Sequence, residues 1–229
     1  SQLADSILIL AAHPDDEVLG CGGTIARHVA AGDQVHVAIL AQGLYSRGEP
    51  TAEQVAGLHE AAERANKLLG VHSLRLFDYP DNSMDTVARL AVTQTIEQLV
   101  AEYRPRVVYS HWIGDVNIDH RRIHEAVVAA CRPQPGHPVE SLLFFEVASS
   151  TEWQTPGSAP AFQPNWFVDI SATLDTKLAA LAAYQAELRD WPHPRSMRGV
   201  EHLARWRGST IGCEAAEAFV LGRHLRPGV

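Results

Sequence analysis

The sequence has few cysteines, no excess of positive charge and no long apolar run. Its three cysteines are far apart and form no C-x-x-C pair, which argues against a disulfide framework and suits a reducing compartment. The net charge is −8 and no basic cluster occurs, so a nucleic-acid partner is not expected. No stretch of about 18 apolar residues is present, and the start lacks the basic and apolar regions of a secretory signal. We therefore expect a cytoplasmic protein without a membrane span, either monomeric or a homo-oligomer.

The composition is that of one globular domain. The chain has 229 residues, of which 46% are hydrophobic and 20% are charged. Strand-like and helix-like segments alternate through residues 1–150, which predicts a Rossmann-like three-layer α/β/α sandwich with a mostly parallel sheet. Residues 151–229 are interpreted as a C-terminal elaboration of the same domain. The expected strands are 7–12, 34–41, 73–77, 106–111, 142–147 and 165–170, and the expected helices are 18–31, 52–69, 85–103, 118–131, 172–189 and 197–207, before a last apolar stretch at 215–221.

The first strand ends in a cluster of ionisable residues. His13, Asp15 and Asp16 follow the apolar run 7–12 directly and precede a helix. In a parallel α/β sheet, ligands bind at this edge. Imidazole nitrogens and carboxylate oxygens are common metal ligands, although an aspartate at a helix start also serves as a cap.

A second group of candidate ligands follows the fourth strand. In a parallel sheet, this strand end lies at the same edge as His13. The spacing of the residues does not choose among the candidates. They are His111, Asp115, Asp119, His120 and His124.

Residues 12–17, A-H-P-D-D-E, resemble the signature of the LmbE/PIG-L family of zinc-dependent N-deacetylases. Asp119 and His120 are similar to the D-H pair of the same family. The resemblance implies His13, Asp16 and His120 as ligands of Zn²⁺, or of another divalent ion such as Fe²⁺. It implies Asp15 as the general base and Asp119 as a residue that orients a ligand or the base. His124 is then interpreted as a helix-face residue.

The activity implied by the resemblance is hydrolysis of the acetamide of an N-acetylated amino sugar or sugar conjugate, by attack of a metal-bound water. One position departs from the pattern, because many members have histidine where this chain has Asn117. Asparagine donates a hydrogen bond but transfers no proton at neutral pH. Either Asp15, once protonated, or His193 must then protonate the leaving amine. His193 lies in a P-H-P-R-S segment, residues 192–196, that resembles a branch of the family.

Several loops at the same edge are expected to contact the substrate. Trp153 is suited to stacking on a sugar face. The segment around Glu217 resembles the A-E-x-F motif of the family and is expected to be structural. The predicted substrate-binding residues are Arg47, Asp81, Asn117 and Arg195.

Other functions are weighed against this one. A glycine-rich stretch, residues 20–23, follows the acidic cluster and lacks the G-x-G-x-x-G spacing, so we interpret it as allowing close packing of a helix on the sheet, not as a nucleotide site. A non-catalytic sugar- or nucleotide-binding module remains an alternative, since Asn117 has replaced a possible acid. A metal hydrolase of an ester or of a non-sugar amide is the third possibility.

Overall fold

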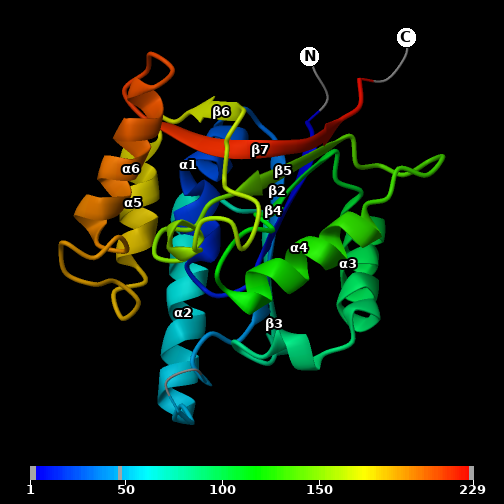
Figure 1. Ribbon diagram of the computed structural model, residues 1–229, viewed down its shortest axis with the longest axis horizontal. Coiled ribbons are helices and arrows are strands. Elements are labelled where there is room, and N and C mark those ends of the chain that lie inside the picture. Colours follow the sequence, from blue (N-terminus) through cyan, green and yellow to red (C-terminus); the bar gives the residue numbers. More distant parts are fainter. Residues whose placement is uncertain (1–3, 46–47, 227–229) are drawn as a thin grey trace.

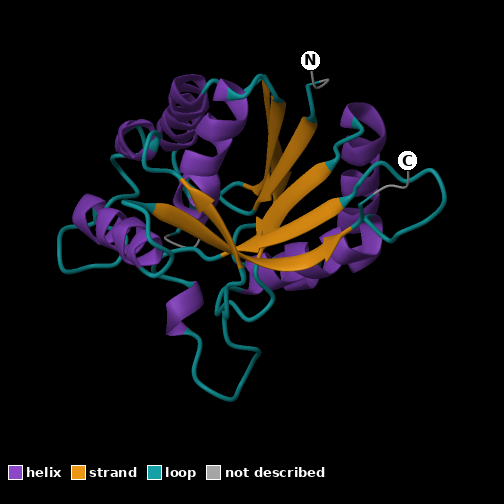
Figure 2. Ribbon diagram, turned by 90° about the horizontal axis from the view of Figure 1, so that it is seen from above, coloured by secondary structure: helices purple, strands orange, loops and turns teal. Residues whose placement is uncertain are grey.

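The computed structural model describes residues 4–45 and 48–226, which form a seven-stranded sheet covered by helices on both faces (Figures 1 and 2). The strands are β1 (Ser6–Ala11), β2 (Gln34–Ala41), β3 (Ser73–Tyr79), β4 (Val107–His111), β5 (Ser141–Phe145), β6 (Trp166–Asp169) and β7 (Ala216–His224). The helices are α1 (Asp16–Ala30), α2 (Ala52–Leu69), α3 (Arg89–Tyr103), α4 (Ile118–Ala130), α5 (Leu174–Ala182) and α6 (Met197–Ser209). The predicted α/β class is confirmed.

The strand order is β3-β2-β1-β4-β5-β7-β6, and the first five strands in the chain are parallel. Strand β1 is buried on both faces, as its continuous apolar sequence predicts. Its alternate side chains enter two separate cores: Ile7 and Ile9 pack on the side of α1, α2, α5 and α6, while Leu8 and Leu10 pack on the side of α3 and α4.

The glycines of α1 allow this helix to lie close to its neighbours. A Cβ atom on Gly23 would stand 2.8 Å from Ile170, and one on Gly20 would overlap the ring of Phe145. Helix α1 also has non-helical angles at Cys21, with φ −150° and ψ 25°. The interpretation of these glycines as packing residues is therefore confirmed.

Two predicted helices are shorter by several residues in the structure. The third was expected from Asp85 but begins at Arg89, because a short 3₁₀ turn at Met84–Thr86 comes first and the Met84 N–H donates to Asp119. The fifth was expected to continue to Arg189 but ends at Ala182. Beyond that point the buried Tyr184 side chain points inward and bonds to Glu17.

The C-terminal elaboration extends the sheet. Strand β7 pairs antiparallel with β5 on one side and with β6 on the other. The last apolar stretch of the sequence thus becomes a strand between two others, shown in red across the sheet in Figure 1. None of the helices in the described part of the chain has both the length and the apolar character needed to cross a bilayer.

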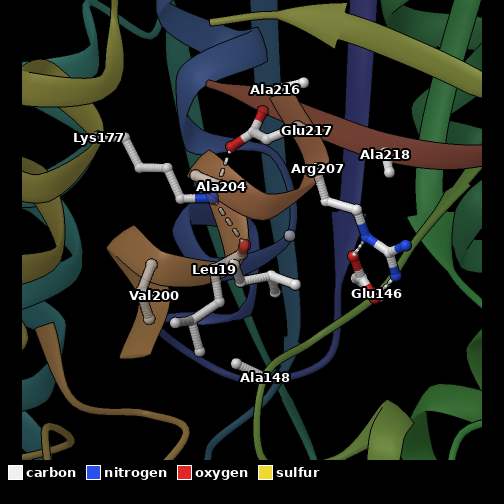
Figure 3. Close-up of a pocket in the computed structure, with 12 residues that line it drawn as sticks. Leu19, Glu146, Ala148, Lys177, Val200, Ala204, Arg207, Ala216, Glu217 and Ala218 are labelled. Atoms are coloured by element: carbon white, nitrogen blue, oxygen red, sulfur yellow. Dashed lines mark hydrogen bonds and ion pairs between the residues drawn. The ribbon is translucent and has the colours of Figure 1, made fainter. Parts of the chain in front are cut away.

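A buried ion pair joins this elaboration to α1 (Figure 3). The ammonium of Lys177 on α5 lies 2.6 Å from Glu217 of β7 and donates to the Leu19 carbonyl at 2.9 Å. Glu217 also accepts the backbone N–H groups of Gly23 and Thr24. The side chains of Lys177 and Glu217 are each only 4% exposed, so removing either one would leave the other buried without its partner.

We expect Lys177→Met to lower the free energy of unfolding by about 3 kcal/mol, because it leaves the Glu217 carboxylate buried without its cation. Urea titration followed by circular dichroism measures this change. Arg205→Met is the matched control, since it removes an exposed pair with Glu201 and is expected to cost less than about 1 kcal/mol. Equal losses in the two variants would contradict the role of the buried pair.

Candidate metal centre

The two predicted ligand groups meet at the carboxyl ends of neighbouring strands. Strand β1 lies between β2 and β4 in the sheet and pairs in parallel with both. The chain passes from β1 to β2 and then to β3 on one side, and returns to form β4 on the other side of β1. The order therefore changes direction between β1 and β4, which is where doubly wound sheets form a ligand crevice. His13 follows β1, and His120 lies in the first turn of α4, which follows β4.

Three side chains converge at this point. His13 Nδ1 lies 3.1 Å and His120 Nε2 lies 3.0 Å from the same Asp16 oxygen, Oδ2. The three ligand atoms all lie within 4.8 Å of one another. The structure thus brings together the three residues that the resemblance implies as metal ligands.

The second nitrogen of each imidazole contacts a carboxylate. His13 Nε2 lies 2.8 Å from Asp119 and 3.2 Å from Asp81, and His120 Nδ1 lies 3.0 Å from Asp115. Metal-binding histidines in proteins are usually oriented by such a contact. Both histidines are therefore held with one nitrogen directed toward Asp16, and this donor set suits zinc or another divalent ion.

The charges at this site favour a cation. Burial alone would lower the pKa of His120, but the negative charges of Asp16 and Asp115 raise it to about 9. Burial alone would raise the pKa of Asp16, but the positive charge of His120 holds it well below its usual range. The pKa of His13 is also raised, because its hydrogen bonds to Asp119 and Asp16 outweigh its burial. The surroundings that stabilise these imidazolium charges would also stabilise a bound metal ion.

Asp15 lines a cavity of about 130 Å³ together with the three clustered residues. Its backbone has φ 113°, a left-handed conformation that is costly for a residue with a side chain. The buried Glu17 fixes this conformation by accepting the Asp15 N–H at 3.0 Å, and Glu17 is bonded in turn to Asn66 and Tyr184. Burial, followed by the charge of Asp16, raises the pKa of Asp15.

Asn117 and Asp81 also line this cavity. The Asn117 oxygen accepts the N–H of Asp119 at 2.9 Å and so caps α4, and its amide nitrogen donates to Asn82 at 2.9 Å. The buried Asp81 carboxylate faces His13 and accepts from Asn82. Both residues therefore support the cluster, and their substrate contacts remain predictions.

Arg195 is one of the residues that line the cavity, whereas His193 is not. Arg195 donates from Nε to Ser149 at 2.9 Å, and its Nη1 lies 3.4 Å from Asp15 Oδ2. His193 packs edge-on against Trp153 and accepts the Arg195 N–H on its Nδ1 at 3.0 Å. Arg47, predicted to bind substrate, lies outside the described residues.

The remaining histidines of this edge have other contacts. His111 accepts the Ala12 N–H on Nε2 at 2.8 Å and stacks on His120 with ring centroids 3.8 Å apart. His124 bonds through Nδ1 to the His111 carbonyl, as befits a residue on the face of a helix. Asp115 accepts a hydrogen bond from the Ser150 hydroxyl. The sequence assigned Asp115 no specific role, because its spacing did not distinguish it from the other candidate ligands after the fourth strand.

Glu187 also lines the cavity, and the sequence did not predict it as a residue of the site. It lies in a segment that was predicted to be helical, and no pattern in the sequence connects it to the distant acidic cluster.

The comparison with known proteins identifies relatives along most of the chain. A family model described as GlcNAc-PI de-N-acetylase (PIG-L) matches residues 8–131. A 1D-myo-inositol 2-acetamido-2-deoxy-alpha-D-glucopyranoside deacetylase of Saccharomonospora viridis is 31% identical, over 97% of each chain. A 4-oxalmesaconate hydratase of Pseudomonas putida is 29% identical, over 82% of this chain and 76% of its own. A conserved protein of Thermus thermophilus has a crystal structure with a TM-score of 0.77 and 29% identity, over 99% of this chain and 98% of that one.

We expect the purified protein to bind about one divalent ion per chain and His120→Ala to lose it, because one of the three predicted ligands is removed. His124→Ala is the matched control, one turn further along α4 and outside the cluster, and it should keep the ion. Elemental analysis after zinc loading and dialysis measures both. Wild-type metal content in both variants would exclude His120 as a ligand. Asp16→Asn is a second test of the same site, with a smaller change of side-chain shape.

Proposed function

The chain belongs to the GlcNAc-PI de-N-acetylase family, and from this membership we propose that it is a metal-dependent N-deacetylase of N-acetylated amino sugars or their conjugates. The observation that carries the proposal is the convergence of His13, Asp16 and His120, with Asp15 in the same cavity. We propose Zn²⁺ as the ion, since two imidazoles and one carboxylate form a common zinc site, and Fe²⁺ as the alternative.

The proposed roles follow from where each group lies. A divalent ion held by His13, Asp16 and His120 would lower the pKa of water and polarise the acetamide carbonyl. Asp15 is the general base: it accepts a proton as a water oxygen bonds to the carbonyl carbon. The C–N bond then breaks, the amine takes a proton, and acetate and the free amino sugar are released.

Two residues are candidates for the group that protonates the amine. Asp15 lines the cavity and holds the proton it has received, so we propose that it returns this proton to the nitrogen. His193 lies outside the lining and accepts the Arg195 N–H, so we propose that it positions Arg195. The guanidinium of Arg195 is directed toward Asp15 and is the proposed contact for substrate oxygens, together with Asp81 and Asn117.

We further propose that residues 1–229 work as one domain. Tyr184 and Arg195 belong to the C-terminal elaboration, and they reach Glu17 and Asp15, respectively. The loop after β1 is thus held by contacts from the C-terminal elaboration as well as from the first part of the chain.

We expect Asp15→Asn to reduce kcat by about 10²-fold or more on N-acetylglucosamine while metal content stays at the wild-type value, because the variant keeps the side-chain shape but accepts no proton. Release of acetate and elemental analysis measure the two quantities. Turnover within tenfold of wild type would exclude Asp15 as the base. If wild-type protein loaded with zinc releases acetate from no N-acetylated sugar, the proposed activity is wrong, and the binding module or the hydrolase of another bond takes its place.

We expect His193→Ala to lower kcat/KM about tenfold and His193→Asn to restore most of it. An asparagine oxygen can accept the N–H two residues further along, as His193 Nδ1 does for Arg195. If instead His193 protonates the amine, both variants should lose kcat equally, since asparagine transfers no proton. The comparison of the two variants therefore separates a positioning role from acid catalysis.

A further inference from the structure

A groove of about 560 Å³ adjoins the cavity that contains Asp15. Helix α2 forms one wall, with Gly57, Leu58 and Ala61, and the turn after α5, residues 183–187, forms the other. In Figure 1 this turn follows α5 on the side of the molecule where α2 lies, and the two helices pack together. The proposed mechanism uses none of the residues of the α2 wall.

The groove and the reaction cavity share part of their walls. Glu187 lines both. In addition, Gly43 lines the reaction cavity and the next residue, Leu44, lines the groove. The groove and the reaction cavity are therefore neighbours, so a substituent on a sugar whose acetamide lies beside Asp15 can continue toward the groove.

The volumes show why a substrate would need this continuation. The reaction cavity, at about 130 Å³, is smaller than the roughly 300–1,000 Å³ that small-molecule pockets usually offer. The groove, at about 560 Å³, falls within that range. The reaction cavity thus accommodates the acetamide and part of one sugar, and whatever else the substrate carries must lie outside it.

The chemistry of the groove indicates what it binds. Apolar side chains, Leu44, Leu58 and Ala186 among them, form a continuous part of its walls, and the buried carboxylate of Glu187 marks the junction with the reaction cavity. Polar side chains complete the lining: Gln54, Arg64 and Gln185. We propose that this groove binds the aglycone of an N-acetylated amino-sugar conjugate, and that the aglycone has an apolar ring. This inference rests on the proposed deacetylase function and names the part of the substrate that the function leaves open.

Gly57 provides a direct test. Among the described residues, no atom outside the adjoining residues and backbone of α2 lies within 4 Å of the position that a Cβ on Gly57 would occupy. A phenylalanine there extends into open space and improves the helix propensity. The probes are N-acetylglucosamine and its α- and β-benzyl glycosides. We expect wild-type protein to process one of the two glycosides with a kcat/KM at least about tenfold above that of the free sugar, since burial of an apolar group gives differences of this order. In Gly57→Phe that ratio should fall to about one.

Ala56→Phe is the matched control, because Ala56 is the exposed neighbour on α2 and lies outside the groove lining. It should keep the wild-type ratio. A wild-type ratio near one, or a ratio that Gly57→Phe leaves intact, would overturn the groove as the aglycone site while leaving the deacetylase function in place. Failure of wild-type protein to release acetate from all three probes would overturn the proposed function, and with it this inference.

Discussion

The burial of several carboxylates at one edge of the sheet is the constraint on which the rest of the structure depends. Asp15, Asp16, Asp115 and Asp119 are each at most 4% exposed, and a buried negative charge is costly unless positive charge or N–H donors lie beside it. Two imidazoles, one guanidinium and a series of backbone N–H groups serve this purpose. The same arrangement of anionic oxygens around two oriented imidazoles suits a divalent cation, so the contacts that stabilise these carboxylates also form the candidate metal centre.

This constraint also explains the position of the C-terminal elaboration. The left-handed backbone of Asp15 depends on Glu17, and Glu17 accepts a hydrogen bond from Tyr184, which follows α5. Arg195 also approaches this loop, with Nη1 3.4 Å from Asp15 Oδ2. Antiparallel strand β7 and the Lys177–Glu217 pair fix α5 against α1 and so hold Tyr184 at this depth. The second part of the chain therefore determines the geometry of a loop that belongs to the first.

Much of the parallel sheet was predictable from the sequence, because a buried strand such as β1 appears as a continuous apolar run followed by polar residues. That the group containing His13 meets the group after β4 was predictable for the same reason, since parallel strands end at one edge. The choice of His120 within the second group came from the family resemblance. The place of β7 between β5 and β6 was not, because antiparallel pairing across about 70 residues leaves no local pattern. The contact of Arg195 with Asp15 spans 180 residues and depends on turns that no periodicity indicates.

Asn117 shows how a departure from a family pattern is to be interpreted when the structure is known. Taken alone, an asparagine in place of histidine suggests a site that has lost its acid. In the structure its oxygen caps α4, where asparagine is among the preferred residues, and its nitrogen bonds to Asn82. The cap fixes the first turn of α4, which contains both Asp119 and His120, so the substitution supports the candidate metal centre at the cost of one titratable group. The strained backbone of Asp15 is kept by the buried Glu17, which is itself bonded to Asn66 and Tyr184, and the upkeep of this conformation favours an enzyme over a binding module.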